Sequence, residues 1–221
     1  MGKVWFVTGA GSGIGAGVVK AALKSGDRVV ATGRNLEKVR KALGGENDEN
    51  LAFVQLDVTD EKQAATAVEQ AVQRFGRIDI LVNNAGYSLL GNFEELTIPD
   101  MERLFATNFW GAVYVMRAAL PAMRKQRSGH IINISSTAGA VGLKHCSAYS
   151  ATKFALEGVS TMTSGKPRTR QDRSEKTDRL PSTSTMATPA FPHARVSAAS
   201  RERCWQGSGR LSKTALACVR P

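Results

Sequence analysis

Short apolar runs alternate with longer amphipathic stretches along the first 160 residues of this 221-residue chain. The apolar runs are rich in β-branched residues, which is typical of strands buried on both faces of a parallel sheet. The pattern predicts strands at 3–8, 27–33, 51–56, 79–82 and 129–135, and helices at 16–25, 36–43, 59–75, 100–127 and 147–162. Strands that alternate with helices in this way predict a three-layer α/β fold with a doubly wound parallel sheet of the Rossmann type.

The pattern changes abruptly after residue 160. Residues 161–221 hold five of the seven prolines and sixteen serines and threonines, and 215–219 is their only notable apolar run. The sequence therefore predicts a dinucleotide-binding domain over 1–160, followed by a disordered, low-complexity tail over 161–221. Because no later strand is predicted, the apolar strand at 129–135 is expected to lie exposed at the edge of the sheet.

The formal charge of +11 also belongs mainly to the tail. Residues 161–221 carry 12 Lys and Arg against 4 Asp and Glu, net +8, and residues 1–160 carry 18 against 15, net +3. Only Phe191 and Trp205 interrupt the tail with aromatic rings. The charge therefore indicates general attraction to acidic partners and no specific nucleic-acid module.

The cysteines and the apolar runs indicate the compartment. Cys146, Cys204 and Cys218 form no CxxC pair and are odd in number, which argues against a zinc site and against a disulfide framework. No signal-peptide pattern opens the chain, and no apolar run approaches the ~20 residues that a membrane span needs. We expect a cytoplasmic protein that binds neither a metal nor a membrane.

A glycine-rich turn, TGAGSGIG at 8–15, separates the first predicted strand from the first helix. Such a turn lets backbone N–H groups approach an anion at the positive end of a helix, which predicts phosphate binding. The spacing is T-G-x-x-x-G-I-G and departs from G-x-G-x-x-G, and a plain tight turn is the alternative interpretation.

The second predicted strand ends in Gly33 and Arg34. An acidic residue at this position would bind a ribose 2′-hydroxyl, whereas arginine favours a 2′-phosphate. The sequence therefore predicts NADP in preference to NAD, unless Arg34 is merely a solvated residue at the start of a helix.

Two further polar turns follow predicted strands, one at Asn83 and Asn84 and one at Ser135 and Ser136. The carboxyl ends of parallel strands share one edge of the sheet, so both turns are expected on the rim that holds the glycine turn. Read alone, the first could also be an ordinary Asx-rich turn.

Tyr149 and Lys153 lie four residues apart, so on a helix they share one face. A free phenol loses its proton near pH ~10, and a neighbouring cation favours the phenolate, so the pair can serve as an acid-base catalyst. Taken alone, the spacing also fits a surface tyrosine and a solvated lysine.

Together these motifs resemble the short-chain dehydrogenase/reductase family over residues 1–160. The resemblance rests on TGAGSGIG at 8–15, Asp57 after the third strand, NNAG at 83–86, Asn108, the serine before the loop, and YSATK at 149–153. In the family the catalytic serine precedes the tyrosine by thirteen residues, which selects Ser136 over Ser135.

The resemblance implies a role for each residue. Ser136 would bind the substrate oxygen, Tyr149 would transfer its proton, and Lys153 would lower the pKa of Tyr149 and bind the nicotinamide ribose. Asn108 would hold a water that links Lys153 to solvent. The implied cofactor-binding residues are Gly9, Ser12, Gly13, Ile14 and Gly15 at the pyrophosphate, Arg34 at the 2′-phosphate, Asp57 and Val58 at the adenine, and Asn83, Ala85 and Gly86 at the adjoining ribose.

The resemblance ends where the tail begins. Family members continue with a sixth strand, a Pro-Gly pair, a helical lid over the substrate and a seventh strand, and this chain contains no Pro-Gly. Two functions stay open: an NADP-dependent oxidoreductase that interconverts a carbonyl and a secondary alcohol, and a catalytically impaired nucleotide-binding chain whose basic tail attracts acidic partners. Family members pair through the helices that carry Asn108 and Tyr149, which implies a homodimer or homotetramer.

The abrupt change at residue 160 suggests that the tail arises from a shifted reading frame or an alternative splice. We predict that another frame of the coding DNA encodes an apolar strand followed by Pro-Gly beyond codon 160. Translating both other frames checks this, and the hypothesis fails if neither contains such a segment.

Overall fold

A computed structural model describes residues 2–44, 48–163 and 216–219, with side chains described up to residue 160. These residues belong to one compact unit, formed by Met1–Lys166 and Thr214–Pro221. A second unit, Pro167–Lys213, lies outside the described residues. The predicted disorder of the tail therefore concerns residues that are not described, apart from 161–163, which are helical, and 216–219, which form a strand.

The five predicted strands form one parallel sheet in the described part of the chain, and a sixth strand joins it. The strands are β1 (Val4–Val7), β2 (Arg28–Gly33), β3 (Leu51–Gln55), β4 (Ile80–Asn83), β5 (His130–Ile134) and β6 (Leu216–Val219). Their order across the sheet is β3-β2-β1-β4-β5-β6, and the first five are mutually parallel. This arrangement confirms the predicted doubly wound sheet, in which the strand order reverses between β1 and β4.

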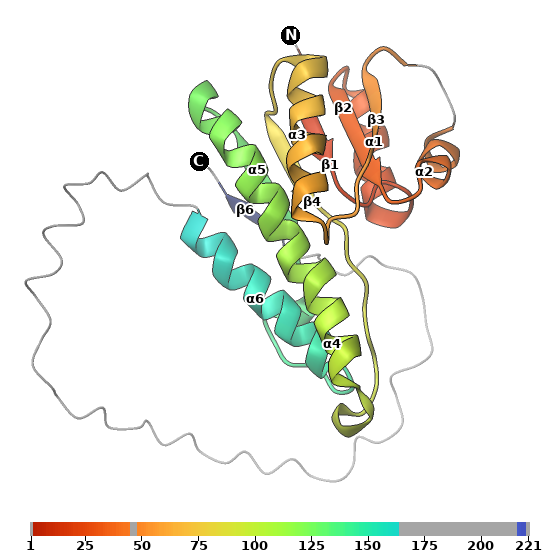
Figure 1. The fold of residues 1–221 in the computed structure, drawn as a ribbon, viewed down its shortest axis with the longest axis vertical. Coiled ribbons are helices and arrows are strands. Elements are labelled where there is room, and N and C mark those ends of the chain that lie inside the picture. The colour runs from red at the N-terminus through yellow and green to blue at the C-terminus, as the bar shows by residue number, and fades with distance from the viewer. Residues whose placement is uncertain (1, 45–47, 164–215, 220–221) are drawn as a thin grey trace, which may run out of the picture. The chain divides into compact units, whose positions relative to one another are not determined.

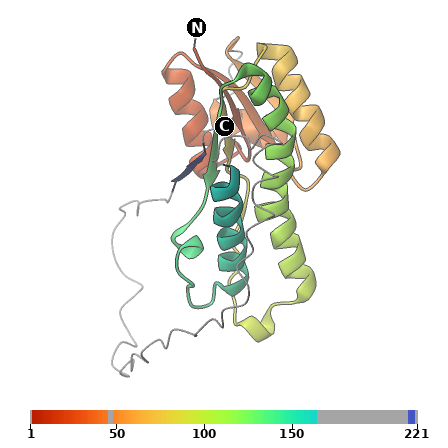
Figure 2. The same ribbon diagram turned by 90° about the vertical axis from the view of Figure 1, so that its left-hand side faces the viewer.

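The helices cover both faces of this sheet (Figures 1 and 2). They are α1 (Gly13–Lys24), α2 (Leu36–Leu43), α3 (Glu61–Phe75), α4 (Ile98–Phe105), α5 (Gly111–Gln126) and α6 (Ser147–Thr163), with short turns η1 (Phe93–Glu95), η2 (Ala106–Trp110) and η3 (Thr137–Gly139). The predicted helix 100–127 is thus divided, because η2 is a π-helical turn between α4 and α5. None of the described helices is long and apolar enough to cross a membrane.

The expectation that β5 forms an exposed edge is wrong. Strand β6 pairs antiparallel with β5, with Leu216 opposite Ile134 and Val219 opposite Ile131. An unpaired strand edge offers a row of free N–H and C=O groups to any extended segment. The one apolar run of the tail occupies that edge, which explains why the edge is not open.

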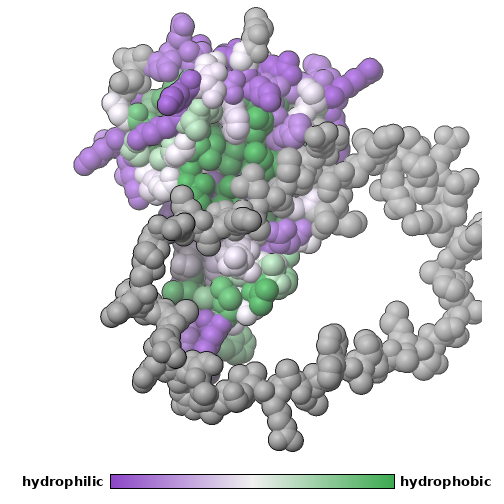
Figure 3. All heavy atoms as spheres, turned by 180° about the vertical axis from the view of Figure 1, so that it is seen from behind, coloured by the Kyte–Doolittle hydropathy of each residue, from purple (hydrophilic) through white to green (hydrophobic). Residues whose placement is uncertain are grey.

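The core lies in two layers, one on each face of the sheet. On one face, small and branched residues of α3 and α5 pack on β1, β3 and β4, with Phe6, Leu81 and Met123 fully buried. On the other face, α1 packs on β1 and β2, and α2 packs on β2 and β3, around Val19 and Val39. On the surface seen from behind, apolar residues gather in a patch bordered by hydrophilic residues (Figure 3).

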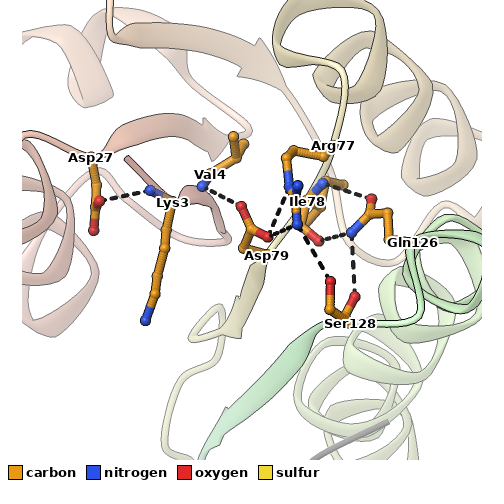
Figure 4. Close-up of polar contacts among 8 residues, drawn as sticks. All are labelled: Lys3, Val4, Asp27, Arg77, Ile78, Asp79, Gln126 and Ser128. Carbon is orange, nitrogen blue, oxygen red and sulfur yellow. Dashed lines mark hydrogen bonds and ion pairs between the residues drawn. The ribbon is translucent and has the colours of Figure 1, made fainter. Parts of the chain in front are cut away.

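Hydrogen bonds close the amino-terminal end of the sheet (Figure 4). The Asp79 carboxylate accepts bonds from the Val4 N–H at 2.9 Å and from the Arg77 guanidinium at 2.6 Å and 2.9 Å. Gln126, at the end of α5, exchanges two bonds with the backbone of Ile78. These contacts tie β1, β4 and α5 together, so the loops at the opposite end rest on a fixed frame.

Candidate active site

A cavity of about 570 Å³ lies where the strands of the parallel sheet end. Eleven of the predicted site residues line it: Gly9, Ser12, Gly13, Ile14, Arg34, Asp57, Val58, Ala85, Gly86, Tyr149 and Lys153. The structure therefore brings the glycine turn, the ends of β2 and β3, the turn after β4 and the tyrosine helix α6 to one site. Gly15, Asn83, Asn108 and Ser136 are not among the lining residues.

The glycine turn packs directly on the turn that follows β4. The Thr8 hydroxyl accepts the N–H groups of Asn84 and Ala85 at 3.0 Å, and the Asn84 side-chain amide donates to the carbonyls of Thr8 and Gly9. A Cβ on Gly15 would lie 2.4 Å from the Gly9 carbonyl oxygen, so only glycine fits there. Gly15 therefore does not line the cavity, but its lack of a side chain allows the glycine turn to fold tightly.

The start of α1 fits an anion. Its N-cap residue, Ser12, makes no side-chain capping bond, and no acidic residue occupies its first turn. Gly13 has a φ of +53°, and a Cβ there would meet nothing within 4 Å. Unsatisfied N–H groups at the positive end of a helix, next to open space, suit the pyrophosphate of a dinucleotide.

The charged side chains that line the cavity just after β2 are basic, and Glu37 of α2 is not among the lining residues. A Cβ on Gly33 would lie 2.8 Å from Val39 Cγ2, which leaves little room for an acidic side chain at that position. Arg34 and Lys38 both line the cavity, and neither forms an ion pair with another described residue. Sequence reasoning missed Lys38, because its place on the cavity wall depends on how α2 packs against the glycine turn.

Asp57 and Val58 line the cavity from the loop after β3. One oxygen of the Asp57 carboxylate accepts both the N–H and the hydroxyl of Thr59, and the Asp57 N–H donates to Gln63. These bonds fix the loop, so the predicted adenine-binding residues have a defined position.

Asn83 lies behind the cavity. Its side-chain amide is buried and donates to Asn133 Oδ1 at 2.9 Å, and Asn133 in turn donates to the Ser160 hydroxyl at 2.8 Å. The next residue, Asn84, lines the cavity instead. The two adjacent asparagines therefore have different roles. Asn83 links β4 to β5 and α6 through Asn133, and Asn84 hydrogen-bonds to the glycine turn.

Asn108 sits in the π-turn η2 and is 1% exposed. The side-chain oxygen of Asn108 accepts a hydrogen bond from the Tyr87 N–H. Its side-chain NH₂ group donates to the Tyr87 carbonyl at 2.8 Å and to the Thr152 hydroxyl at 3.2 Å. The side chain therefore clamps the turn after β4 to α6. The water expected at Asn108 stays a prediction.

Tyr149 and Lys153 both face the cavity from α6. The Lys153 ammonium donates to the Ile134 carbonyl at 2.7 Å and lies 5.7 Å from the centre of the Tyr149 ring. Only 6% of Lys153 is exposed. This burial lowers the pKa of Lys153 from 10.5 to about 8, although the Glu157 carboxylate opposes the shift.

The two serines after β5 differ in access. Ser135 lines the cavity, but its hydroxyl oxygen is buried and has no hydrogen-bond partner among the described residues. The Ser136 side chain is half-buried, and its oxygen accepts the Ala138 N–H at 3.2 Å. Because that bond uses the oxygen as acceptor, the hydroxyl hydrogen of Ser136 is left to donate elsewhere.

Comparison with known proteins identifies the class. The family model described as short chain dehydrogenase matches residues 3–167, and the chain belongs to this family. It is 41% identical over 162 residues to the oxidoreductase BOA17 of Botryotinia fuckeliana, a match that covers 73% of this chain and 59% of that protein.

Solved structures agree with this assignment. A short-chain dehydrogenase from Streptomyces avermitilis matches with a TM-score of 0.71 and 40% identity, over 74% of this chain and 60% of that one. ElxO with NADP bound matches with a TM-score of 0.70 and 38% identity, over 74% of this chain and 67% of that one. A family member from Burkholderia phymatum in complex with NAD matches at 0.69 and 28% identity, over 74% and 59%.

The match is partial on both sides. The chain spans 59% and 51% of the length of the first two curated relatives that it resembles. The activity, substrates and partners of the whole protein are therefore matters for proposal.

The burial of Lys153 makes a prediction for stability. A group whose folded pKa lies below its unfolded value costs stability while it is protonated, and this cost disappears as the pH rises from about 8 to 10.5. The unfolding free energy of the wild type, measured relative to Lys153→Met, should therefore rise by roughly 3 kcal/mol between neutral pH and the upper end of this window.

Urea titrations at several pH values measure this difference. Lys125→Met, which replaces an exposed lysine on α5, is the matched control. A constant gap between the wild type and Lys153→Met would show that the ammonium is not held in a buried site.

Proposed function

We propose that this protein is an NADP-dependent oxidoreductase that interconverts a carbonyl and a secondary alcohol. The observation that supports this most is the position of Lys153, whose buried ammonium lies 5.7 Å from the Tyr149 ring inside the cavity bordered by the glycine turn. An acid-base pair beside a dinucleotide site is what hydride transfer to a carbonyl requires.

The residues of the cavity would hold the cofactor along its length. The N–H groups at the start of α1, from Gly13 and Ile14, suit the pyrophosphate, and Arg34 suits a 2′-phosphate. Asp57 with Val58 would flank the adenine, and Ala85 with Gly86 would flank a ribose. Bound NADP supplies or accepts the hydride. We prefer NADP to NAD because Gly33 and Arg34 occupy the end of β2, where a carboxylate would bind a ribose 2′-hydroxyl.

Two side chains, Tyr149 and Ser136, would act on the substrate oxygen, and Lys153 would act on Tyr149. Tyr149 would donate a proton to it during reduction and remove the proton during oxidation. The Lys153 ammonium would stabilise the phenolate that Tyr149 becomes after donating. Ser136 would donate its free hydroxyl hydrogen to the same oxygen and hold it where negative charge develops.

A second candidate function is nucleotide binding without turnover. The partial coverage of the relatives supports it, because a chain that matches 59% of an oxidoreductase can keep the nucleotide half of a site and lack part of the substrate half. The nucleotide-binding residues named above serve both candidates, so measured turnover separates them.

Tyr149→Phe tests the catalytic proposal. We expect turnover of NADPH with a panel of aldehydes and ketones to fall by about 10²-fold or more, because the proton donor is lost and the ring keeps its packing. NADPH binding, followed by fluorescence, should change little. A wild-type chain that binds NADPH and turns over no member of the panel supports the second candidate.

The serine pair offers a matched comparison. We expect Ser136→Ala to lower kcat by about 10²-fold and Ser135→Ala to leave kcat within a few-fold, because the Ser135 hydroxyl oxygen is buried whereas the half-buried Ser136 has a hydroxyl hydrogen free to donate. Steady-state rates of the two variants measure this. A larger loss in Ser135→Ala would reverse the assignment.

We further propose a cytoplasmic homodimer. Trp110 and Phe154 are 48% and 46% exposed and come from η2 and α6, which are in contact. Exposed aromatic rings on adjacent elements are typical of an interface.

Light scattering of Phe154→Glu should give half the wild-type mass, and Phe93→Glu, which changes an exposed ring on η1, is the control. A wild-type monomer would refute the proposal.

A further inference from the structure

Helix α2 carries three basic side chains, and they face different surroundings. The Arg40 guanidinium lies over the Phe53 ring, 4.3 Å from its centre, and is therefore used in packing. Lys41 is not among the residues that line the cavity, whereas Lys38 is. Lys38 thus stands apart as the basic side chain that α2 contributes to the candidate site.

The position of Lys38 is fixed at both its backbone and its stem. Asn35 caps the helix, and its side-chain oxygen accepts the Lys38 N–H at 2.9 Å. Lys38 Cγ and Cδ lie 3.5 and 3.7 Å from where a Cβ on Gly11 would be, which is ordinary van der Waals distance. The methylene stem therefore lies beside Gly11 of the glycine turn, at a distance where even a Cβ would make only ordinary contact.

The charged residues that line the cavity near the end of β2 are mainly basic. Arg34, directly after β2, and Lys38, on α2, both line the cavity, and the acidic residue among the lining residues, Asp57, already uses one oxygen for Thr59. Gly33 has no side chain to compete for a ribose hydroxyl. Glu37, which stands between these two cations in the sequence, is not among the lining residues. Two cations on the cavity wall suit a doubly charged phosphate, which Arg34 can contact with a planar fork and Lys38 with a point charge.

We infer that Lys38 joins Arg34 in binding the 2′-phosphate of the dinucleotide and that it helps to select NADP over NAD. This inference rests on the cofactor proposed above. It adds a residue that acts on specificity and has no part in proton transfer.

Adenosine 2′,5′-bisphosphate and 5′-AMP are suitable probes, because they differ only in the 2′-phosphate and need neither the nicotinamide end of the site nor turnover. Calorimetric titration of the full chain gives the affinity of each. We expect Lys38→Gln to weaken binding of the bisphosphate about tenfold and to change binding of 5′-AMP less than twofold. Lys41→Gln, the matched control on the same helix, should change neither.

The outcomes separate this inference from the proposed function. A wild type that prefers the bisphosphate, with a Lys38→Gln variant that keeps the full preference, would overturn the role of Lys38 and leave NADP as the cofactor. Equal weakening of both ligands in Lys38→Gln would place Lys38 at the shared 5′-phosphate and overturn the inference as well. A wild type that binds both probes equally would remove the preference for NADP and the inference together.

Discussion

One buried contact, between the Lys153 ammonium and the Ile134 carbonyl, fixes the geometry on which the rest of the site depends. It attaches α6 to the end of β5, and α6 carries Tyr149 one turn earlier. Burying an ammonium is costly, and a single neutral carbonyl compensates for only part of the cost, which is why the pKa of Lys153 falls. The structure thus retains a destabilising charge at the place where the proposed chemistry needs one.

Two other sets of bonds hold α6 in the same register. Asn108 joins the turn after β4 to Thr152, and Asn133 joins β5 to Ser160 near the far end of the helix. These side chains are buried and touch the cavity only indirectly. At the opposite end of the sheet, Asp79 and Gln126 close the frame, so movement is restricted at the base of the strands. The open rim is therefore supported by buried polar groups on more than one side.

Much of this arrangement could be predicted from the sequence, because the relevant signals are local. Apolar runs and glycine turns mark β1 to β5 and the start of α1, and the spacing of Tyr149 and Lys153 places both on one helix face. What the sequence could not show depends on contacts between distant residues. Strand β6 depends on pairing with β5, which is distant in the sequence. The different roles of Asn83 and Asn84 depend on their different hydrogen-bond partners, Asn133 for Asn83 and the Gly9 carbonyl for Asn84. Lys38 was missed because its role depends on how α2 lies against Gly11.

The ionisation of Lys153 tests the account most directly. Nuclear magnetic resonance of side-chain-labelled lysine, with Lys153→Arg used to assign the signal, follows the proton on this ammonium as the pH is raised. The account predicts a midpoint at about 8. A midpoint near 10.5, the ordinary pKa of lysine, would mean that the ammonium is solvated and does not tie α6 to β5.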